Sequence, residues 1–400
     1  MDPVEVHLAQ VLAAVRPLAP ARYGLEAAEG CVLAEDTRAA LALPSFDNSA
    51  MDGYAVHAAD IAAATAEDPV SLPVADEVTA GDTRQLTVEP GSCVIIMTGA
   101  LMPGGADTVI PVEWTDGGRE TAQFHRAAPA GNSVRRRGVD VAVGDLLLPA
   151  GTRLGPAQIA LLAAGGSAHP LVRRAPVAAV IATGSELVEP GQDLAPGQIW
   201  DSNSYLIAAA VRRSGGMARR HRVPDDPVAM LGALEAQAPL CDLLITTGGV
   251  SMGGQHDVVK ASLSGWDDVT FRKVAMQPGM PQGFGVIGER RTPLFALPGN
   301  PVSAFVSFHL FVRPALDALR GLTATTPVLR ATLTDGVRSP SGKRSYLRGT
   351  LDLAARTVTP LNGQDSHRLG TLAHATALII VGETVTELAA GAETDVISLP

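Results

Sequence analysis

The feature that most constrains this chain is a regular alternation of apolar strands and amphipathic helices between residues 173 and 322. The run PVAAVIATG at 176–184 is typical of a buried strand, and residues 201–216 combine a polar cap, an apolar face and a terminal Gly pair. Such alternation predicts a doubly wound, largely parallel sheet. Further strands are expected at 217–223, 242–249, 269–275 and 283–287, further helices at 227–238 and 256–263, and a last helix with Pro301 in its first turn.

The rest of the chain is more β-rich, apart from an amphipathic helix expected at residues 4–15. Short strands separated by Gly and Pro turns follow, and a small β-barrel or sandwich is expected after Gly321. We therefore predict an α/β plus β fold in an elongated multidomain chain. The predicted parts are a discontinuous N-terminal mixed α/β lobe (1–45 and 136–172), an inserted β-rich lobe (46–135), an α/β domain (173–322) and a C-terminal β-barrel domain (323–400).

Charge and cysteine usage narrow the function. The net charge of −10 argues against nucleic-acid binding but allows a small anionic ligand on a local basic patch, with a divalent cation as a bridge. Cys31, Cys93 and Cys241 have no metal-binding spacing and indicate a reducing compartment. The N-terminus is acidic where a signal peptide is basic, and no apolar run approaches a membrane span. We expect a cytoplasmic protein that binds neither nucleic acid nor membrane.

Three predicted strand ends in the α/β domain carry Gly and hydroxyl residues, at 183–186, 246–254 and 297–303. Ligands of open α/β sheets bind at this edge, where Gly lets backbone amides approach and helix N-termini attract anions. One such turn is common for conformational reasons alone, whereas three indicate a phosphate-containing ligand. The predicted substrate contacts are Thr183, Gly184, Ser185, Gly248, Gly249, Ser251, Pro298, Gly299, Asn300 and Ser303.

Carboxylates accompany these loops: Glu186, Asp225 and Asp257. Carboxylate oxygens and a substrate phosphate together suit Mg²⁺, so Mg²⁺ is the expected metal. The alternative is that each acid merely caps a helix, which for Asp225 and its neighbour Asp226 is about as plausible. Glu186 and Asp257 lie in Gly turns, which favours a functional role.

Polar groups also gather in the β-rich lobe. The segment DNSAMDGYA at 47–55 is dense in hydrogen-bonding side chains around Asp52, and Thr98 ends a strand. A plain Asp-Gly turn and a turn threonine are the alternatives. The basic run 135–137, including Arg137, is more often a solvated face, but its Gly boundary favours an anion contact.

Several of these stretches occur in the order seen in the molybdenum insertases (molybdopterin molybdenumtransferases), which the whole chain resembles. The most specific are DNSAMDGYA and LPGNPVSA at 297–304; IMTGA, RRRG, PAGTRL, TGSEL and TGGVSMG support them. The resemblance implies a homodimer of four-domain subunits with sites at the junction between them. It also implies a Mg²⁺-dependent hydrolysis of adenylylated molybdopterin, releasing AMP, and the insertion of molybdate into the dithiolene.

The resemblance also assigns roles to matching positions. Asp52, Glu186, Asp225 and Asp257 are expected to be catalytic, with Glu186 and Asp257 as metal ligands. Thr98 joins the active cleft, and Arg348 and Ser366 match positions associated with molybdate. An oxyanion needs Arg with hydroxyl or amide donors, so it is chemically reasonable that carboxylates bind the metal whereas Arg348 and Ser366 bind molybdate.

The sequence departs from the family pattern in the charge of one turn. Where the family commonly has Lys-Pro-Gly-Lys-Pro, this chain has Gln277-Pro278-Gly279-Met280-Pro281, so two cations are missing. We hypothesise that Lys273 and Arg348 carry the anion charge instead.

Three alternatives compete with this interpretation. The chain could adenylylate molybdopterin, which predicts ATP consumption. It could be a non-catalytic scaffold of the kind that the homologous part of gephyrin provides, which predicts a hydrophobic peptide groove. It could also be a specialised paralogue with weakened insertion, which the missing lysines favour.

Overall fold

The computed structural model describes residues 1–249, 257–263, 266, 268–324 and 326–399. The chain forms two compact units. Unit 1 contains Met1–Ala21, Gly30–Ala34 and Val172–Pro400, and unit 2 contains Arg22–Glu29 and Glu35–Leu171. Each unit is described by itself below.

Unit 1 is built on a six-stranded sheet in the order β16-β13-β17-β21-β20-β18. Strands β16, β13, β17 and β21 are parallel, whereas β20 and β18 run antiparallel to their neighbours. The strand bounds are β13 (Val177–Thr183), β16 (Met217–Val223), β17 (Leu243–Thr247), β18 (Val269–Lys273), β20 (Pro281–Ile287) and β21 (Thr292–Leu297).

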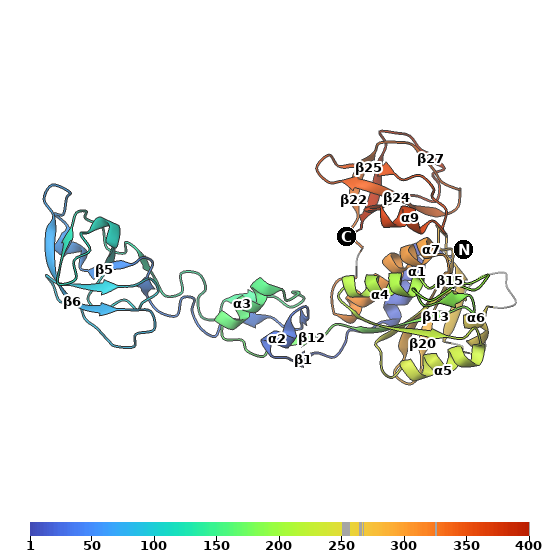
Figure 1. Cartoon of the computed structure of the whole chain (residues 1–400), viewed down its shortest axis with the longest axis horizontal. Helices are drawn as coiled ribbons and strands as arrows, with labels where there is room; N and C mark the ends of the chain where they lie inside the picture. The colour runs from blue at the N-terminus through green and yellow to red at the C-terminus, as the bar shows by residue number, and fades with distance from the viewer. Residues whose placement is uncertain (250–256, 264–265, 267, 325, 400) are drawn as a thin grey trace. The chain divides into compact units, whose positions relative to one another are not determined.

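Helices cover both faces of this sheet, which confirms the doubly wound prediction (Figure 1). Along β13, Ala178 and Val180 pack into one core while Ala179 and Ile181 pack into the other, as the two-residue period of a strand requires. The first core contains residues of α1 (Val4–Ala14), α4 (Asn203–Arg213), α7 (Pro301–Ser307), η3 (Phe308–Val312) and α8 (Arg313–Leu319); the second contains residues of α5 (Pro227–Gln237) and α6 (Val258–Ser262).

The sheet is largely parallel, as predicted, although not wholly so, and the N-terminal helix lies elsewhere than predicted. The sheet is mixed because β20 and β21 are joined by a tight turn, closed by a hydrogen bond from the Arg291 amide to the Gly288 carbonyl, and so short a link permits only an antiparallel pair. The helix α1 packs against the α/β core instead of staying with the N-terminal lobe. Its apolar residues Val4 and Val11 are buried there, which explains the difference.

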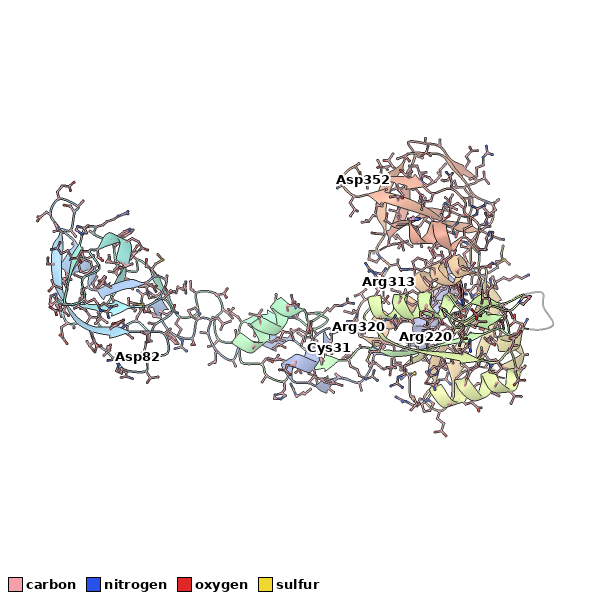
Figure 2. The ribbon with its side chains drawn as sticks, viewed as in Figure 1. Cys31, Asp82, Arg220, Arg313, Arg320 and Asp352 are labelled. Carbon is pink, nitrogen blue, oxygen red and sulfur yellow. The ribbon has the colours of Figure 1, made fainter. Side chains whose placement is uncertain are left out.

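A buried arginine fixes a second N-terminal segment to the same domain. Arg320, at the end of α8, is fully buried, and its guanidinium donates to the carbonyls of Gly30 (2.8 Å) and Ser214 (3.4 Å). Figure 2 labels it close to Cys31. Beside it, β2 (Val32–Leu33) pairs antiparallel with β12 (Leu171–Arg173) through Val172 and Arg173.

The C-terminal part of unit 1 is a small barrel, as predicted. Its strands run β24-β25-β22-β28-β26, and a pairing of β26 with β24 closes the ring. The short strand β19, which begins the Gln277–Pro281 turn, pairs parallel with β24 and so joins the barrel to the α/β domain. The bounds are β19 (Met276–Gln277), β22 (Leu329–Leu333), β23 (Val337–Arg338), β24 (Arg344–Asp352), β25 (Thr357–Pro360), α9 (Leu369–Ala373), β26 (Ala377–Val381), β27 (Glu387–Leu388) and β28 (Glu393–Ser398).

One helical stretch of unit 1 is long and apolar enough to cross a membrane by length and composition alone. It covers Pro301–Leu319 with a mean hydropathy of 1.3, but 78% of that window is buried inside the fold. It is therefore accounted for as the core helix of the α/β domain.

Unit 2 contains a five-stranded sheet in the order β8-β5-β7-β6-β9, with β6 and β7 parallel and the other pairs antiparallel. Its core includes Tyr54, Ile61 and Phe124. The elements are α2 (Leu25–Ala28), β3 (Thr37–Arg38), β4 (Asn48–Ser49), β5 (Gly53–Val56), η1 (Ala58–Ile61), β6 (Val70–Val78), β7 (Cys93–Ile96), β8 (Thr108–Pro111), η2 (Val112–Trp114), β9 (Thr121–Phe124), β10 (Val134–Arg135), β11 (Leu146–Leu148) and α3 (Pro156–Ala164).

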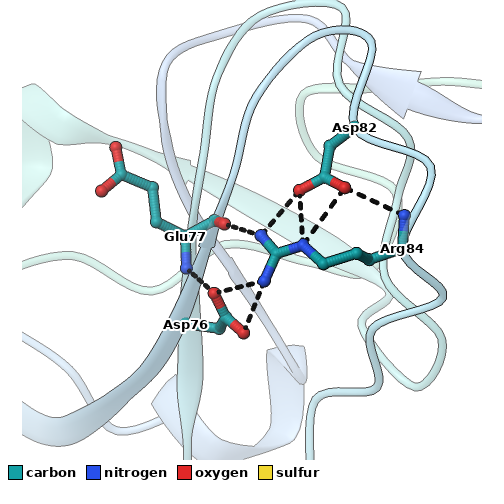
Figure 3. A network of polar contacts seen from close by, with 4 residues as sticks. All are labelled: Asp76, Glu77, Asp82 and Arg84. Carbon is teal, nitrogen blue, oxygen red and sulfur yellow. Dashed lines mark hydrogen bonds and ion pairs between the residues drawn. The ribbon is translucent and has the colours of Figure 1, made fainter.

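A polar network fastens the loop after β6 to that strand (Figure 3). The Arg84 guanidinium donates to both carboxylate oxygens of Asp82 and of Asp76, and to the Glu77 carbonyl. These bonds lower the pKa of Asp82 below the usual value of an aspartate. The pKa of Asp76 is lowered first by a hydrogen bond from the Glu77 amide (2.7 Å) and then by those from Arg84. Because the arginine is surrounded by its own partners, we interpret the network as structural.

Candidate functional site

The carboxyl ends of β13, β17 and β21 bring three Gly-rich loops into contact. The Gly248 amide donates to the Leu297 carbonyl at 3.1 Å. A β-carbon placed on Gly248 would lie 3.5 Å from the Thr183 carbonyl oxygen, and one placed on Gly299 would lie 3.5 Å from Gly248 Cα. The loops containing Thr183–Gly184, Gly248–Gly249 and Pro298–Gly299 thus lie side by side, in the order that the sheet imposes.

Glycine is required at two of these positions. Gly248 and Gly249 have φ angles of +89° and +70°, which L side chains rarely adopt. At Gly249 a β-carbon would also lie 2.7 Å from a methyl carbon of Val259. The backbone here can therefore approach a ligand closely. Ser251, predicted in the same loop, lies outside the described residues.

The pair Asp225-Asp226 divides into two roles. Asp226 caps α5, accepting a hydrogen bond from the Ala229 amide at 2.8 Å. Asp225 instead lies beside the end of β13, with its carboxylate 3.2 Å from the Thr183 hydroxyl. Asp225 is exposed and has an oxygen available to a ligand of the first loop.

Glu186 and Asp257 occupy different environments. Glu186 is exposed, and its carboxylate covers Gly184 so closely that a β-carbon there would lie 2.7 Å from an oxygen. Asp257 is buried at the N-cap of α6, where it accepts from the Lys260 amide at 3.4 Å. Within the described residues, no group of three His, Cys, Asp or Glu side chains could hold a metal. The acids present fit Mg²⁺ only as a metal shared with ligand phosphates, which complete its coordination with one or two carboxylates.

The third loop connects the α/β domain to the barrel. Asn300 at the N-cap of α7 donates from its side-chain amide to the Ser366 hydroxyl at 3.0 Å, and the Val302 amide donates to the Ser366 carbonyl at 3.1 Å. Asn203, which was not among the predicted residues, donates to the Gly299 carbonyl at 2.5 Å. The Asn203 Oδ1 atom is buried and has no hydrogen-bond partner among the described residues, so a ligand donor would satisfy it. The only sequence signal for it was the polar start of the helix at 201–204.

A pocket of about 550 Å³ opens where the Gln277–Pro281 turn faces the Ser366 loop. Its lining includes the predicted Ser303 and Ser366 and the neutral Gln277 and Met280. The turn is fixed from behind because the Gln282 side chain donates to the Gly279 carbonyl at 2.5 Å and to the Ser307 hydroxyl at 2.6 Å. The pocket also includes Lys343 and His367, which sequence reasoning missed although His367 directly follows the predicted Ser366 and Lys343 lies five residues before the predicted Arg348.

Arg348 and Lys273 are placed outside this lining. Arg348 is only 1% exposed, and its guanidinium donates to the carbonyls of Gly363 (2.7 Å) and Asp365 (3.2 Å). Burial lowers the pKa of Arg348 from its usual value. Lys273 is exposed at the end of β18. Their roles toward an oxyanion stay predictions, but Arg348 holds the loop that carries Ser366.

In unit 2, Asp52 and Thr98 form a direct pair. The Asp52 carboxylate accepts from the Thr98 hydroxyl at 2.7 Å and from the Thr98 amide at 2.6 Å. These bonds, the hydroxyl's first, lower the pKa of Asp52 below its usual value, and both residues are exposed. The carboxylate is therefore ionised, oriented and open to solvent.

The basic run 135–137 is partly neutralised. Arg136 forms an ion pair with Asp47 at 2.7 Å, and the backbone amide of Arg137 donates to the same carboxylate at 2.7 Å. The pKa of Asp47 is lowered by these bonds, first by the one from the Arg137 amide. The Arg137 side chain is exposed.

This fold and site define a multidomain α/β protein with Gly-rich strand ends and a polar pocket bordered by a C-terminal barrel. Comparison with known families gives three matches: "MoeA N-terminal region (domain I and II)" over residues 2–166, "Probable molybdopterin binding domain" over 179–318, and "MoeA C-terminal region (domain IV)" over 330–399.

Proteins that match this chain over nearly its whole length carry names of the same family. "Molybdopterin molybdenumtransferase 2" of Mycobacterium tuberculosis is 45% identical over 405 aligned positions that cover 99% of each chain. The molybdopterin molybdenumtransferase of a Nostoc species is 36% identical over 94% of this chain and 88% of its own. A crystal structure of a molybdopterin biosynthesis MoeA protein from Pyrococcus horikoshii superposes with a TM-score of 0.82 at 31% identity, covering 99% of this chain and 98% of that one. The chain belongs to the molybdopterin molybdenumtransferase (MoeA) family of enzymes.

Proposed function

We propose that this protein inserts molybdate into the dithiolene of molybdopterin, using adenylylated molybdopterin as substrate and releasing AMP in a Mg²⁺-dependent step. Membership of the family supports the transfer of molybdenum. The observation that carries the finer proposal is the Asn300–Ser366 hydrogen bond, which joins the Gly-rich strand ends to the polar pocket. One substrate could therefore reach both places with its two ends.

In this proposal the strand ends hold the phosphates. The amides of Gly248 and Gly249 can approach phosphate oxygens because no side chain intervenes. Asp225 accepts a proton from, and so orients, the attacking water, since its free oxygen lies beside the same loop. Glu186 and Asp257 would hold Mg²⁺, which supplies positive charge to the phosphate oxygens. At the pocket, Ser303 and Ser366 donate to the oxyanion.

The test is a reaction that contains the protein, adenylylated molybdopterin, Mg²⁺ and molybdate. We expect AMP release and cofactor formation, and loss of AMP release when EDTA removes Mg²⁺ and its return when Mg²⁺ is added. The absence of AMP release from the wild-type protein would refute the proposal. Consumption of ATP with molybdopterin would instead support the adenylyltransferase alternative.

We further propose a cytoplasmic homodimer with sites at the junction between its subunits. The three cysteines are free and buried, which suits a reducing compartment. Light scattering would measure the mass. Mixing inactive Asp52→Asn and Glu186→Gln proteins after subunit exchange tests the shared site, because a dimer that combines residues from both chains regains activity. A monomeric mass, or no recovery after verified exchange, would contradict this part.

A further inference from the structure

We propose that Lys343 supplies the positive charge for the oxyanion in the pocket between the Gln277–Pro281 turn and the Ser366 loop. This inference rests on the proposed function, because it concerns the oxyanion of the same reaction. It competes with our hypothesis that Lys273 and Arg348 carry the charge, which stays a prediction. The neutral Gln277 and Met280 leave the pocket in need of such a group.

The parallel pairing of β19 with β24 places Lys343 at the pocket. Met276 and Gln277 pair with Arg344 and Ser345, and the Arg344 amide donates to the Ala275 carbonyl at 2.9 Å. Lys343 is the residue immediately before this ladder, so the backbone fixes it against the turn. It lines the pocket together with Gln277, Met280 and Ser303, which is 5% exposed.

The other nearby cations are already engaged. Arg344 forms ion pairs with Glu5 and with Glu383, the latter at 2.8 Å. Arg368 pairs with the Asp365 carboxylate at 2.9 Å. The third cation, Arg348, is buried, and its two terminal nitrogens donate hydrogen bonds to backbone carbonyls. Arg344 and Arg368 are thus balanced by carboxylates, and Arg348 lies outside the lining of the pocket.

Lys343, by contrast, forms no ion pair and no hydrogen bond with any residue in the described part of the chain. It is partly buried, so its ammonium group acts at a lower effective dielectric than a fully solvated charge would. A flexible lysine supplies a point charge rather than a rigid fork, which suits a tetrahedral oxyanion approached also by hydroxyls. Asp365, the acid in the lining, is neutralised by Arg368.

The experiment measures the molybdate dependence of cofactor formation and, separately, AMP release. Lys343→Gln should raise the molybdate concentration for half-maximal rate about tenfold, with a smaller change in the rate at saturation, and Lys343→Arg should retain most of the affinity. Arg330→Gln is the matched control, because it removes one exposed positive charge from the same barrel. It should leave the molybdate dependence unchanged.

Two further variants test the role of Lys343 in the pocket against that of Lys273. Met280→Lys in the Lys343→Gln background returns a cation to the same pocket and should recover a large part of the lost affinity. If Lys343→Gln behaves like the wild type while Lys273→Gln raises the molybdate requirement, the inference is overturned. Failure of the wild type to release AMP would instead reject the proposed function. Binding of molybdate alone, measured by calorimetry, gives a readout of Lys343 that does not need turnover.

Discussion

At the scale of single residues, the Asp52–Thr98 pair yields the clearest prediction. The lowered pKa of Asp52 means that its charge persists as the pH falls from neutrality through 5 and is lost only below its usual value. Asp52→Asn removes this charge and should reduce AMP release by about 100-fold, the scale of a lost general base or ligand anchor. Thr98→Val removes the hydroxyl donor and should raise the pKa of Asp52, so that activity is lost at a higher pH on acidification.

Both variants should keep the melting temperature of the wild type, because the two side chains are exposed. AMP release as a function of pH and thermal unfolding are the two measurements. Full activity of Asp52→Asn at neutral pH would remove Asp52 from the mechanism.

The candidate site residues whose place in the fold could be read from the sequence are those with a visible demand on the backbone. Gly248 and Gly249 follow a buried strand, and their positive φ angles are a local need that the sequence itself reveals. Lys343 and Asn203 were missed because contacts with segments far away in the sequence bring them to the candidate site. Arg348 was assigned from the resemblance, and only the structure shows that its guanidinium faces backbone carbonyls.

At the scale of elements, the strands and helices of the α/β domain could be predicted because apolar periodicity records burial directly. The strands β13 and β17 are buried on both faces and read as continuous apolar runs. The direction of β20 could not be read this way, because antiparallel and parallel central strands share the same pattern. The turn between Gly288 and Arg291 decides it.

The π-helical segment η3 contains a buried histidine that makes stability depend on pH. Burial, aided by the charge of Arg313, lowers the pKa of His309 to about 4. In the unfolded chain the pKa of a histidine is near 6.5. Between about pH 4 and about pH 6.5 the histidine is therefore protonated in the unfolded state and neutral in the folded state. Stability conferred by neutral His309 is therefore lost as the pH falls, by about 2 kcal/mol between pH 7 and pH 5.

His309→Phe keeps an aromatic ring beside Phe305 and removes the titration. We expect a smaller loss of unfolding free energy on acidification than in the wild type, measured by urea unfolding at pH 7 and pH 5. His7, whose pKa is also lowered to about 4 by burial, is unchanged in both proteins and cancels in the comparison. An equal loss in both proteins would contradict the assignment to His309.

At the scale of the whole molecule, two units with separate hydrophobic cores should unfold in separate transitions. Phe124 is buried in the core of unit 2 and Leu378 in a core of unit 1. Truncating either side chain to Ala should cost about 3 kcal/mol or more. Calorimetry should show two transitions, with Phe124→Ala and Leu378→Ala each lowering a different one. A single transition that both variants lower equally would show that the units unfold together.

The docking of α1 into the α/β core also determines the order in which the protein can be assembled on the ribosome. The ring of His7 contacts that of Phe311 with centroids 4.7 Å apart, and Val4 and Val11 belong to the same core as Leu316. Helix α1 therefore has to wait for its partners in η3 and α8, which are synthesised later, while residues 35–171 can fold in between. Until then the nascent chain exposes the apolar face of this helix to solvent, which makes α1 a natural point of attachment for chaperones.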